Sequence, residues 1–228
     1  MVRRLLPILL ALLAFPAAAK DELVLAMTQA PGTMNPLISS MLAKSLIRNM
    51  TARPITAYDP DWKLVCLVCE ALPSLDKGTA RLVTLADGKQ GIETDYTLKP
   101  MKWGDGTPVT AKDIAFTIEV GKHPQSGVAS GEGYRRIVKF DIKDDLSFTV
   151  TTDRVTFDYD GFDFSILPAH LEKPIFDANP TEYRTKTTYD TDPTNPGLAF
   201  GPYRIVELVP GNRIVLEQNP TWIGEKPH

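Results

Sequence analysis

Histidine and cysteine are scarce in this sequence of 228 residues, which has three histidines and two cysteines. The histidines, His123, His170 and His228, lie far apart and do not complete the ligand spacing of a zinc site. The sequence also lacks an H-E-x-x-H motif, a P-loop and a G-x-S-x-G nucleophile motif. These absences leave no positive support for an enzyme, and we expect no catalytic residue, no bound metal and no cofactor.

The sequence also has no excess of positively charged residues. The formal net charge is −3, and no cluster of Lys and Arg stands out. Nucleic acids attract clustered basic residues, so we expect no nucleic-acid partner. A hydrophobic content of 43% is enough for a substantial core, and the length fits one large or two small domains.

Long apolar runs are absent except at the start of the chain. The first 19 residues begin with two arginines, continue with an apolar run over residues 5–15 and end in small residues through Ala19. This order is typical of a secretory signal peptide cleaved after Ala19, and the run is too short to span a bilayer. No cysteine follows the cleavage site, so the mature chain, residues 20–228, is expected to be secreted, soluble and free of a lipid anchor.

The two cysteines, Cys66 and Cys69, are separated by two residues. A local structural disulfide is the simplest interpretation in an oxidising compartment, and the spacing allows it. Two unpaired thiols in the core, and redox or metal chemistry, remain as alternatives.

The remaining pattern predicts short strands mixed with helices. A buried strand is expected at residues 22–27 and a helix over residues 37–50, with Leu37, Met41, Leu42 and Leu46 on its apolar face. Further strands are expected near residues 53–58, 63–66, 79–85 and 91–98. Hairpins are expected over residues 138–150 and 201–219, because apolar residues alternate there around turn residues. Without regular βαβ alternation, the fold class is mixed α/β or α+β.

Residues 153–199 are rich in Pro, Asp and Thr, and we expect an irregular segment with one or two short helical turns. Asp158, Asp160 and Asp163 alternate there with aromatic residues. A solvated face is the interpretation that this pattern favours.

Residues 102–119, KWGDGTPVTAKDIAFTIE, carry the most specific local pattern. The stretch from Gly104 to Pro108 predicts a turn, and Thr110 with Asp113 predicts a capping box that opens a helix reaching about Lys122.

The passage YTLKPMKWGDGTPVTAKDIAFTIE, residues 96–119, resembles the signature of the family 5 extracellular solute-binding proteins, the oligopeptide, dipeptide and nickel-type receptors of bacterial ABC importers. Other pieces match in the same order: LVLAMTQAPGTMNPL, ILPAHL, and NPGLAFGPYRIVELVPGNRIVLEQNPTWIGEKP. The resemblance covers essentially the whole mature chain.

The resemblance implies a periplasmic-binding-protein-like fold in which two lobes close on a ligand. Family members are considerably longer, so residues 20–228 are expected to be the N-terminal lobe alone, in a chain that is a fragment. A truncated gene product that binds poorly is the alternative. It also implies a periplasmic monomer that captures peptides or another small solute, delivers them to an ABC permease and performs no chemistry. A secreted thiol–disulfide enzyme using Cys66 and Cys69, and a one-lobe adaptor or sensory partner of a membrane receptor, are the alternatives.

The same resemblance suggests where a solute binds. The loop formed by Gly32, Thr33, Met34 and Asn35 is the first candidate, since the corresponding family loop faces the cleft; an ordinary turn capped by Asn35 is the competing interpretation. A second candidate is the glycine-rich segment 127–134, which ends at Tyr134. A plain surface loop is the competing interpretation of this segment. Residues of the 96–119 signature are expected to serve the scaffold: Trp103, Asp105, Gly106, Thr110 and Asp113.

Overall fold

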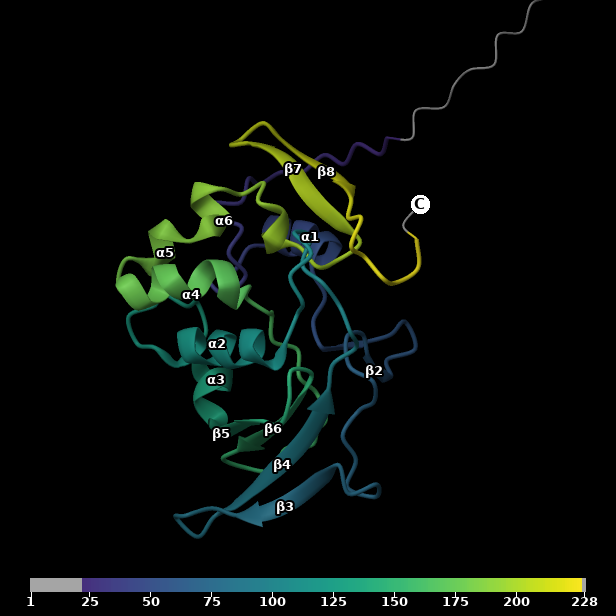
Figure 1. Cartoon of the computed structure of the whole chain (residues 1–228), viewed down its shortest axis with the longest axis vertical. Helices are drawn as coiled ribbons and strands as arrows, with labels where there is room; N and C mark the ends of the chain where they lie inside the picture. The colour runs from purple at the N-terminus through teal and green to yellow at the C-terminus, as the bar shows by residue number, and fades with distance from the viewer. Residues whose placement is uncertain (1–21, 227–228) are drawn as a thin grey trace, which may run out of the picture.

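The computed structural model describes residues 22–226, so the expected signal peptide at residues 1–19 lies outside the described residues. Helices alternate irregularly with antiparallel strands (Figure 1). The elements are α1 (Leu42–Thr51), β1 (Thr56–Tyr58), β2 (Leu64–Cys66), β3 (Ala80–Thr84), β4 (Gln90–Thr97), α2 (Ala111–Lys122), α3 (Glu132–Arg136), β5 (Ile137–Ile142), β6 (Ser147–Thr152), α4 (Ala169–Ala178), α5 (Tyr183–Lys186), α6 (Thr188–Thr191), the 3₁₀ turn η1 (Pro196–Leu198), β7 (Tyr203–Val209) and β8 (Arg213–Gln218).

The largest sheet has the strand order β3-β4-β6-β5, and every neighbouring pair is antiparallel. It lies at one end of the molecule, with α2 and α3 beside it and the β7–β8 hairpin and α1 at the other end (Figure 1). On its inner face the rings of Tyr96 and Phe148 stack with centroids 5.6 Å apart, and both side chains are buried. The predicted mixed α/β class, the strands expected after residue 50 and both hairpins are confirmed.

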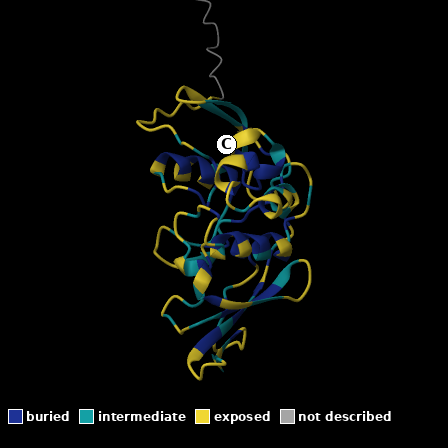
Figure 2. Ribbon diagram, turned by 90° about the vertical axis from the view of Figure 1, so that its left-hand side faces the viewer, coloured by how far each residue is buried: buried dark blue, intermediate teal, exposed yellow. Residues whose placement is uncertain are grey.

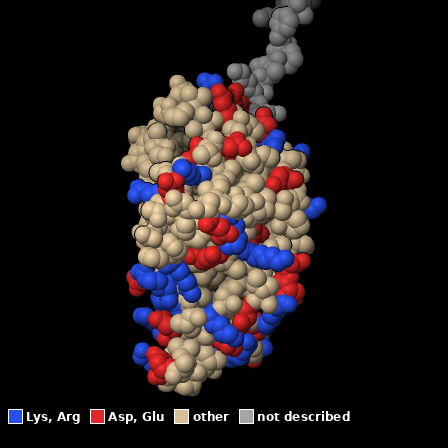
Figure 3. Space-filling view, turned by 60° about the vertical axis from the view of Figure 1, so that its left-hand side comes forward, with Lys and Arg blue, Asp and Glu red and all other residues tan. Residues whose placement is uncertain are grey.

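The outer face of this sheet is polar. Asp95 accepts hydrogen bonds from Arg81 at 2.7 Å, Lys143 at 2.7 Å and Thr149 at 2.6 Å. Burial opposes ionisation of Asp95, but these donors hold the pKa of its carboxyl well below its usual range. Figure 3 shows that charges of both signs are interspersed over the part of the surface it displays. One wet face explains the clean alternation in the sequence.

The predicted turn and capping box are present. The Trp103 side chain is completely buried and meets Phe200 edge-on, with centroids 4.8 Å apart. Gly106 adopts a φ of +90°, in the left-handed region that favours glycine. Thr110 caps α2, and the Asp113 carboxylate accepts from the Thr110 backbone N–H at 2.8 Å and from that of Ala169 at 2.8 Å. The signature therefore joins the sheet to α2 and α2 to α4. Most residues of α2 are buried, in the interior that Figure 2 colours dark blue.

The prediction of a buried strand at residues 22–27 is wrong. This segment forms no strand within the described residues, and its apolar side chains are exposed, Leu23 to 81%. A strand needs a neighbour to satisfy its backbone, and none of the described strands pairs with this segment.

The predicted helix over residues 37–50 begins five residues late, and its apolar face was wrong. It starts at Leu42 and buries Ala43, Lys44, Ile47, Arg48 and Thr51, whereas Leu42 and Leu46 are exposed. The cause lies before the helix, because Ser39 has a φ of +58°. This left-handed conformation is incompatible with continuous helix through the stretch, although the Asn35 side chain accepts from the Leu37 backbone N–H at 3.0 Å as a helix cap does.

The segment predicted to be irregular, residues 153–199, is more helical than expected. It contains α4, α5, α6 and η1, and α4 has ten residues despite Pro174 within it. Packing decides this: the fully buried Glu172 of α4 accepts from the Thr188 backbone N–H of α6 at 2.8 Å. Such contacts are invisible in the local sequence pattern.

A disulfide joins Cys66, at the end of β2, to Cys69, with the Cα atoms 5.1 Å apart. Cys69 is completely buried and forms an isolated bridge with Leu98. Within residues 22–226 there is no free cysteine and no cluster of residues suited to a metal ion.

Candidate functional site

The loop from Gly32 to Asn35 has an accessible first half and a buried second half. Gly32 is exposed and Thr33 half-buried, whereas Met34 and Asn35 are buried. The Asn35 amide donates to the Tyr183 hydroxyl at 3.2 Å, in addition to accepting from Leu37. Asn35 is therefore an anchor of the turn, and only the first half of the loop is open to a ligand.

Lys44 of α1 holds this loop in place through hydrogen bonds to its backbone. Its ammonium donates to the backbone carbonyls of Asn35 at 2.8 Å and Ile38 at 2.5 Å, and also to that of Ser39. The side chain is only 4% exposed. One buried cation thus satisfies three carbonyls that the interrupted helix leaves without helical partners.

Lys44 is expected to make the fold more stable as the pH rises from about 8 to about 10. Burial first, and then the Arg48 charge, lower its pKa from 10.5 to about 8. Between these values the unfolded chain keeps the proton that the folded chain has released, so the free energy of unfolding rises by up to about 1.4 kcal/mol per pH unit. Urea unfolding near pH 7.5 and near pH 9.5 measures this rise, and the Lys44→Met variant should lack it. Equal pH dependence in both proteins contradicts the assignment.

Tyr134, the predicted second ligand contact, lies in the core. It is 5% exposed and stacks on Phe164 with centroids 4.4 Å apart. Its ring also packs so closely on Gly121 that a Cβ there would lie 2.2 Å from it. Tyr134 therefore holds α3 against α2, and in this position it offers no surface to a solute.

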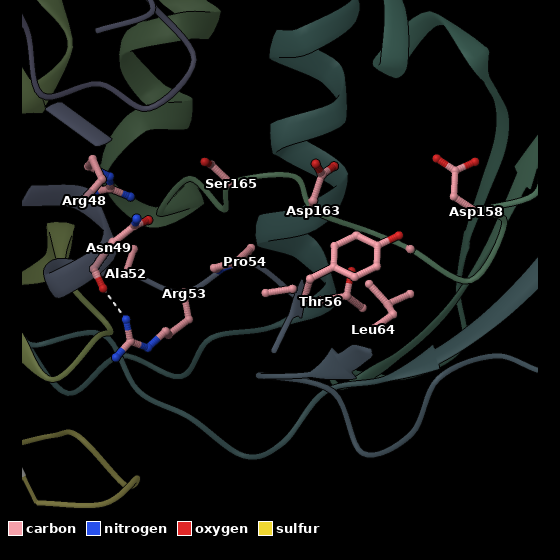
Figure 4. A pocket seen from close by; sticks show the side chains of 13 residues that line it. Arg48, Asn49, Ala52, Arg53, Pro54, Thr56, Leu64, Asp158, Asp163 and Ser165 are labelled. Carbon is pink, nitrogen blue, oxygen red and sulfur yellow. Dashed lines mark hydrogen bonds between the residues drawn. The ribbon is translucent and has the colours of Figure 1, made fainter. Parts of the chain in front are cut away.

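A cavity of about 420 Å³ lies between the end of α1, the β1–β2 hairpin and the segment that follows β6 (Figure 4). Neither the 32–35 loop nor Tyr134 lines it. Its lining comprises Arg48, Asn49, Ala52, Arg53, Pro54, Thr56, Ala57, Tyr58, Leu64, Asp158, Gly161, Asp163 and Ser165.

The wall formed by residues 161–165 is an extended strand-like segment. Its backbone is tied to Thr56 of β1, whose N–H donates to the Phe162 carbonyl at 3.1 Å and whose hydroxyl accepts from the Phe162 N–H at 2.8 Å. Since side chains alternate along extended chain, Phe162 and Phe164 pack against the core while Asp163 and Ser165 line the cavity. The sequence showed this alternation, but it did not show that the polar side would face a cavity.

The charges of the cavity are separated. Arg48, Asn49 and Arg53 lie at one end, Asp158 lies at the other, and Asp163 lies between them (Figure 4). Arg53 donates to the Asn49 carbonyl, lies 5.8 Å from the centre of the Trp222 ring, and has its pKa lowered by burial. Arg48 donates to the Leu198 carbonyl at 3.4 Å and lies 5.2 Å from the centre of the Tyr189 ring. A pocket with a basic end and an acidic end is suited to a dipolar solute.

Residues 86–228 match the model of the bacterial extracellular solute-binding proteins, family 5. The chain belongs to this family. The resemblance found in the 96–119 signature is thereby confirmed.

Two relatives show how the family 5 chain aligns with known binding proteins. It is 26% identical over 212 residues to the oligopeptide-binding protein AppA of Bacillus subtilis, covering 91% of this chain and 35% of the relative. It is 27% identical over 208 residues to the peptidoglycan-binding protein YepA of Agrobacterium fabrum, covering 87% of this chain and 28% of the relative. The chain thus spans about a third or less of the length of these relatives.

The fold agrees with this assignment. The oligopeptide-binding protein of Thermus thermophilus, solved with a pentapeptide, superposes with a TM-score of 0.71 at 26% identity, over 82% of this chain and 35% of that chain. The predicted periplasmic-binding-protein-like fold is confirmed.

Family membership bears on the expected class of protein. The family and the relatives are named as binding proteins. This agrees with the prediction of a binding protein, and the alternative of a thiol–disulfide enzyme is not supported. The family is described as extracellular. Over residues 22–226, the structure has no helix with the length and apolarity needed to cross a bilayer.

Proposed function

We propose that this chain captures a small dipolar solute, most simply a peptide, as part of an extracytoplasmic binding protein. The observation that carries the proposal is the cavity of about 420 Å³ with Arg48 and Arg53 at one end and Asp158 and Asp163 towards the other. Its volume falls within the range of small-molecule sites, about 300–1,000 Å³. A peptide matches its charge separation, because every peptide with free termini carries one charge of each sign.

Two further observations support a peptide. AppA and the Thermus protein are named for oligopeptide binding, and the latter was solved with a pentapeptide. The accessible Gly32 and Thr33 also offer backbone groups to an extended chain, in the manner of strand addition. In this proposal the 32–35 loop is a second contact region, separate from the cavity.

The proposal extends to the whole protein. Residues 20–228 form the N-terminal lobe of a longer periplasmic protein, which works as a monomer and delivers its solute to an ABC permease. Membership of family 5 and the fraction of the relatives that the chain covers support this view.

Thermal unfolding with added ligand tests the proposal. Peptides of three to five residues are expected to raise the Tm by about 5–10 °C at a hundredfold excess over Kd, because binding to the folded state alone then adds about 2.7 kcal/mol. Nickel chelates and a muropeptide serve as comparison ligands, and a panel without any shift contradicts the proposal. Recovery from membranes of a receptor without a permease would instead favour the adaptor alternative.

A further inference from the structure

The acidic end of the cavity is the end whose charged groups have no ion-pair partner, although the two arginines and two aspartates of the lining balance in number. At the basic end, Arg53 donates to the Asn49 carbonyl and lies over the Trp222 ring, and Arg48 donates to the Leu198 carbonyl and lies over the Tyr189 ring. The Nε and Nη2 atoms of Arg48 are buried without a hydrogen-bond partner among the described residues. Within residues 22–226, by contrast, neither the Asp158 nor the Asp163 carboxylate forms an ion pair or a side-chain hydrogen bond, and both residues are exposed. Both carboxylates of the acidic end are therefore free to meet a positively charged group of a solute.

The β1–β2 hairpin carries two exposed aromatic side chains, one of which lines the cavity. Tyr58 lines the cavity, and its ring lies 6.3 Å from that of Trp62, at an angle of 47°. Both are exposed, Tyr58 to 56% and Trp62 to 83%. Aromatic faces attract cations, so the pair adds to the attraction that the carboxylates exert.

Trp62 occupies a backbone position that does not favour it. The hairpin loop is tightened by Asp59, whose carboxylate accepts from the backbone N–H of Asp61 and of Lys63, both at 2.9 Å. Trp62 then adopts a φ of +60°, in the left-handed region that is unfavourable for a residue with a Cβ. At 83% exposure its ring recovers little of that cost by burial, so the indole is available at the surface.

We infer that the acidic side of the cavity selects solutes with a basic side chain. This inference rests on the proposed function. Asp158 and Asp163 hold the ammonium or guanidinium group, and Tyr58 and Trp62 form an aromatic lip over it. A carboxylate-bearing side chain in the same place meets two unpaired carboxylates and is rejected. The site thus discriminates by charge, which a purely apolar pocket does not do.

Three tripeptides that differ only in the central residue test the inference: Ala-Lys-Ala, Ala-Gln-Ala and Ala-Glu-Ala, measured by calorimetry at low salt. The lysine peptide is expected to bind about tenfold more tightly than the glutamine peptide, and the glutamate peptide most weakly. In the Asp158→Asn/Asp163→Asn double variant this preference should vanish, whereas Asp76→Asn, an exposed substitution away from the cavity, should keep it.

The outcomes separate the two proposals. If none of the three peptides binds the wild-type chain, the proposed peptide function fails. If all three bind with equal affinity, or if the double variant keeps the preference for lysine, the proposed function stands and the charge selection is overturned.

A second variant tests the aromatic lip. Trp62→Gly is expected to keep or raise the Tm, because glycine relieves the positive φ, yet to weaken binding of Ala-Lys-Ala about threefold. Phe157→Ala removes another exposed ring, which does not line the cavity, and should leave the affinity unchanged. Unchanged affinity in Trp62→Gly rules the lip out.

Discussion

Replacing Lys44 by methionine is expected to lower the free energy of unfolding by about 3 kcal/mol. The substitution keeps the length and the apolar stem of the side chain but removes the ammonium that serves the carbonyls of Asn35, Ile38 and Ser39. Each buried carbonyl left without a donor costs about 1–3 kcal/mol, and relief from burying a charge offsets only part of that loss. Urea unfolding near pH 7 measures the change.

Lys112→Met is the matched control. Lys112 is exposed, and its ion pair with Asp145 is 3.5 Å long between two largely exposed side chains. An exposed pair of this kind contributes little, so the control should change stability by less than about 0.5 kcal/mol. If the two variants are equally stable, the Lys44 contacts do not stabilise the loop.

Trp103→Ala is expected to cost about 3–5 kcal/mol, the range for removing a large aromatic side chain from a core. The indole is completely buried and packs edge-on against Phe200, which precedes β7. The centre of its ring also lies 6.1 Å from that of the His170 ring of α4, so one side chain packs near two distant parts of the chain. Loss of the indole leaves a cavity that rigid backbone on these sides cannot close.

Trp62→Ala provides the control for this second substitution, since it removes the same side chain from a site where it is 83% exposed. We expect a change below about 0.5 kcal/mol. A loss of less than about 1 kcal/mol in Trp103→Ala would show that the turn tolerates the missing indole and that its burial is incidental.

Much of the fold could be predicted because it follows from local patterns. The hairpins β5–β6 and β7–β8 showed alternating apolar residues, and α2 showed its capping box at Thr110 and Asp113. These signals belong to one sheet face or one helix end. They need no knowledge of distant residues.

The buried face of α1 could not be predicted, because it depends on contacts with distant residues. Apolar periodicity assigned Leu42 and Leu46 to the core, but the helix buries Lys44 and Arg48 instead. Their partners are carbonyls of an interrupted turn and, for Arg48, the Leu198 carbonyl 150 positions away. A buried cation satisfied by backbone oxygens has the same sequence signature as an exposed one.

The sequence showed only part of the candidate site. The alternation of carboxylates and aromatics around Asp158 and Asp163 is plain in the sequence, and it indicated one polar and one apolar side. Which side faces a cavity depends on the pairing of Thr56 with Phe162, across 106 positions. The 32–35 loop was located correctly as a turn, but its burial at Met34 and Asn35 depends on contacts with α1 and α5.

The C-terminal end of α1 is completed by residues translated much later. The Thr51 carbonyl accepts from the backbone N–H groups of Phe200 at 3.0 Å and Gly201 at 2.8 Å, and a Cβ on Gly201 would lie 2.6 Å from the Thr51 backbone. Contacts between such distant positions form slowly, because a long loop must close before any of them is gained. A nascent chain that ends before residue 200 cannot acquire this arrangement. The helix α1 therefore completes its native contacts only after Gly201 has been synthesised, so the order of synthesis sets when its C-terminal end can reach its final environment.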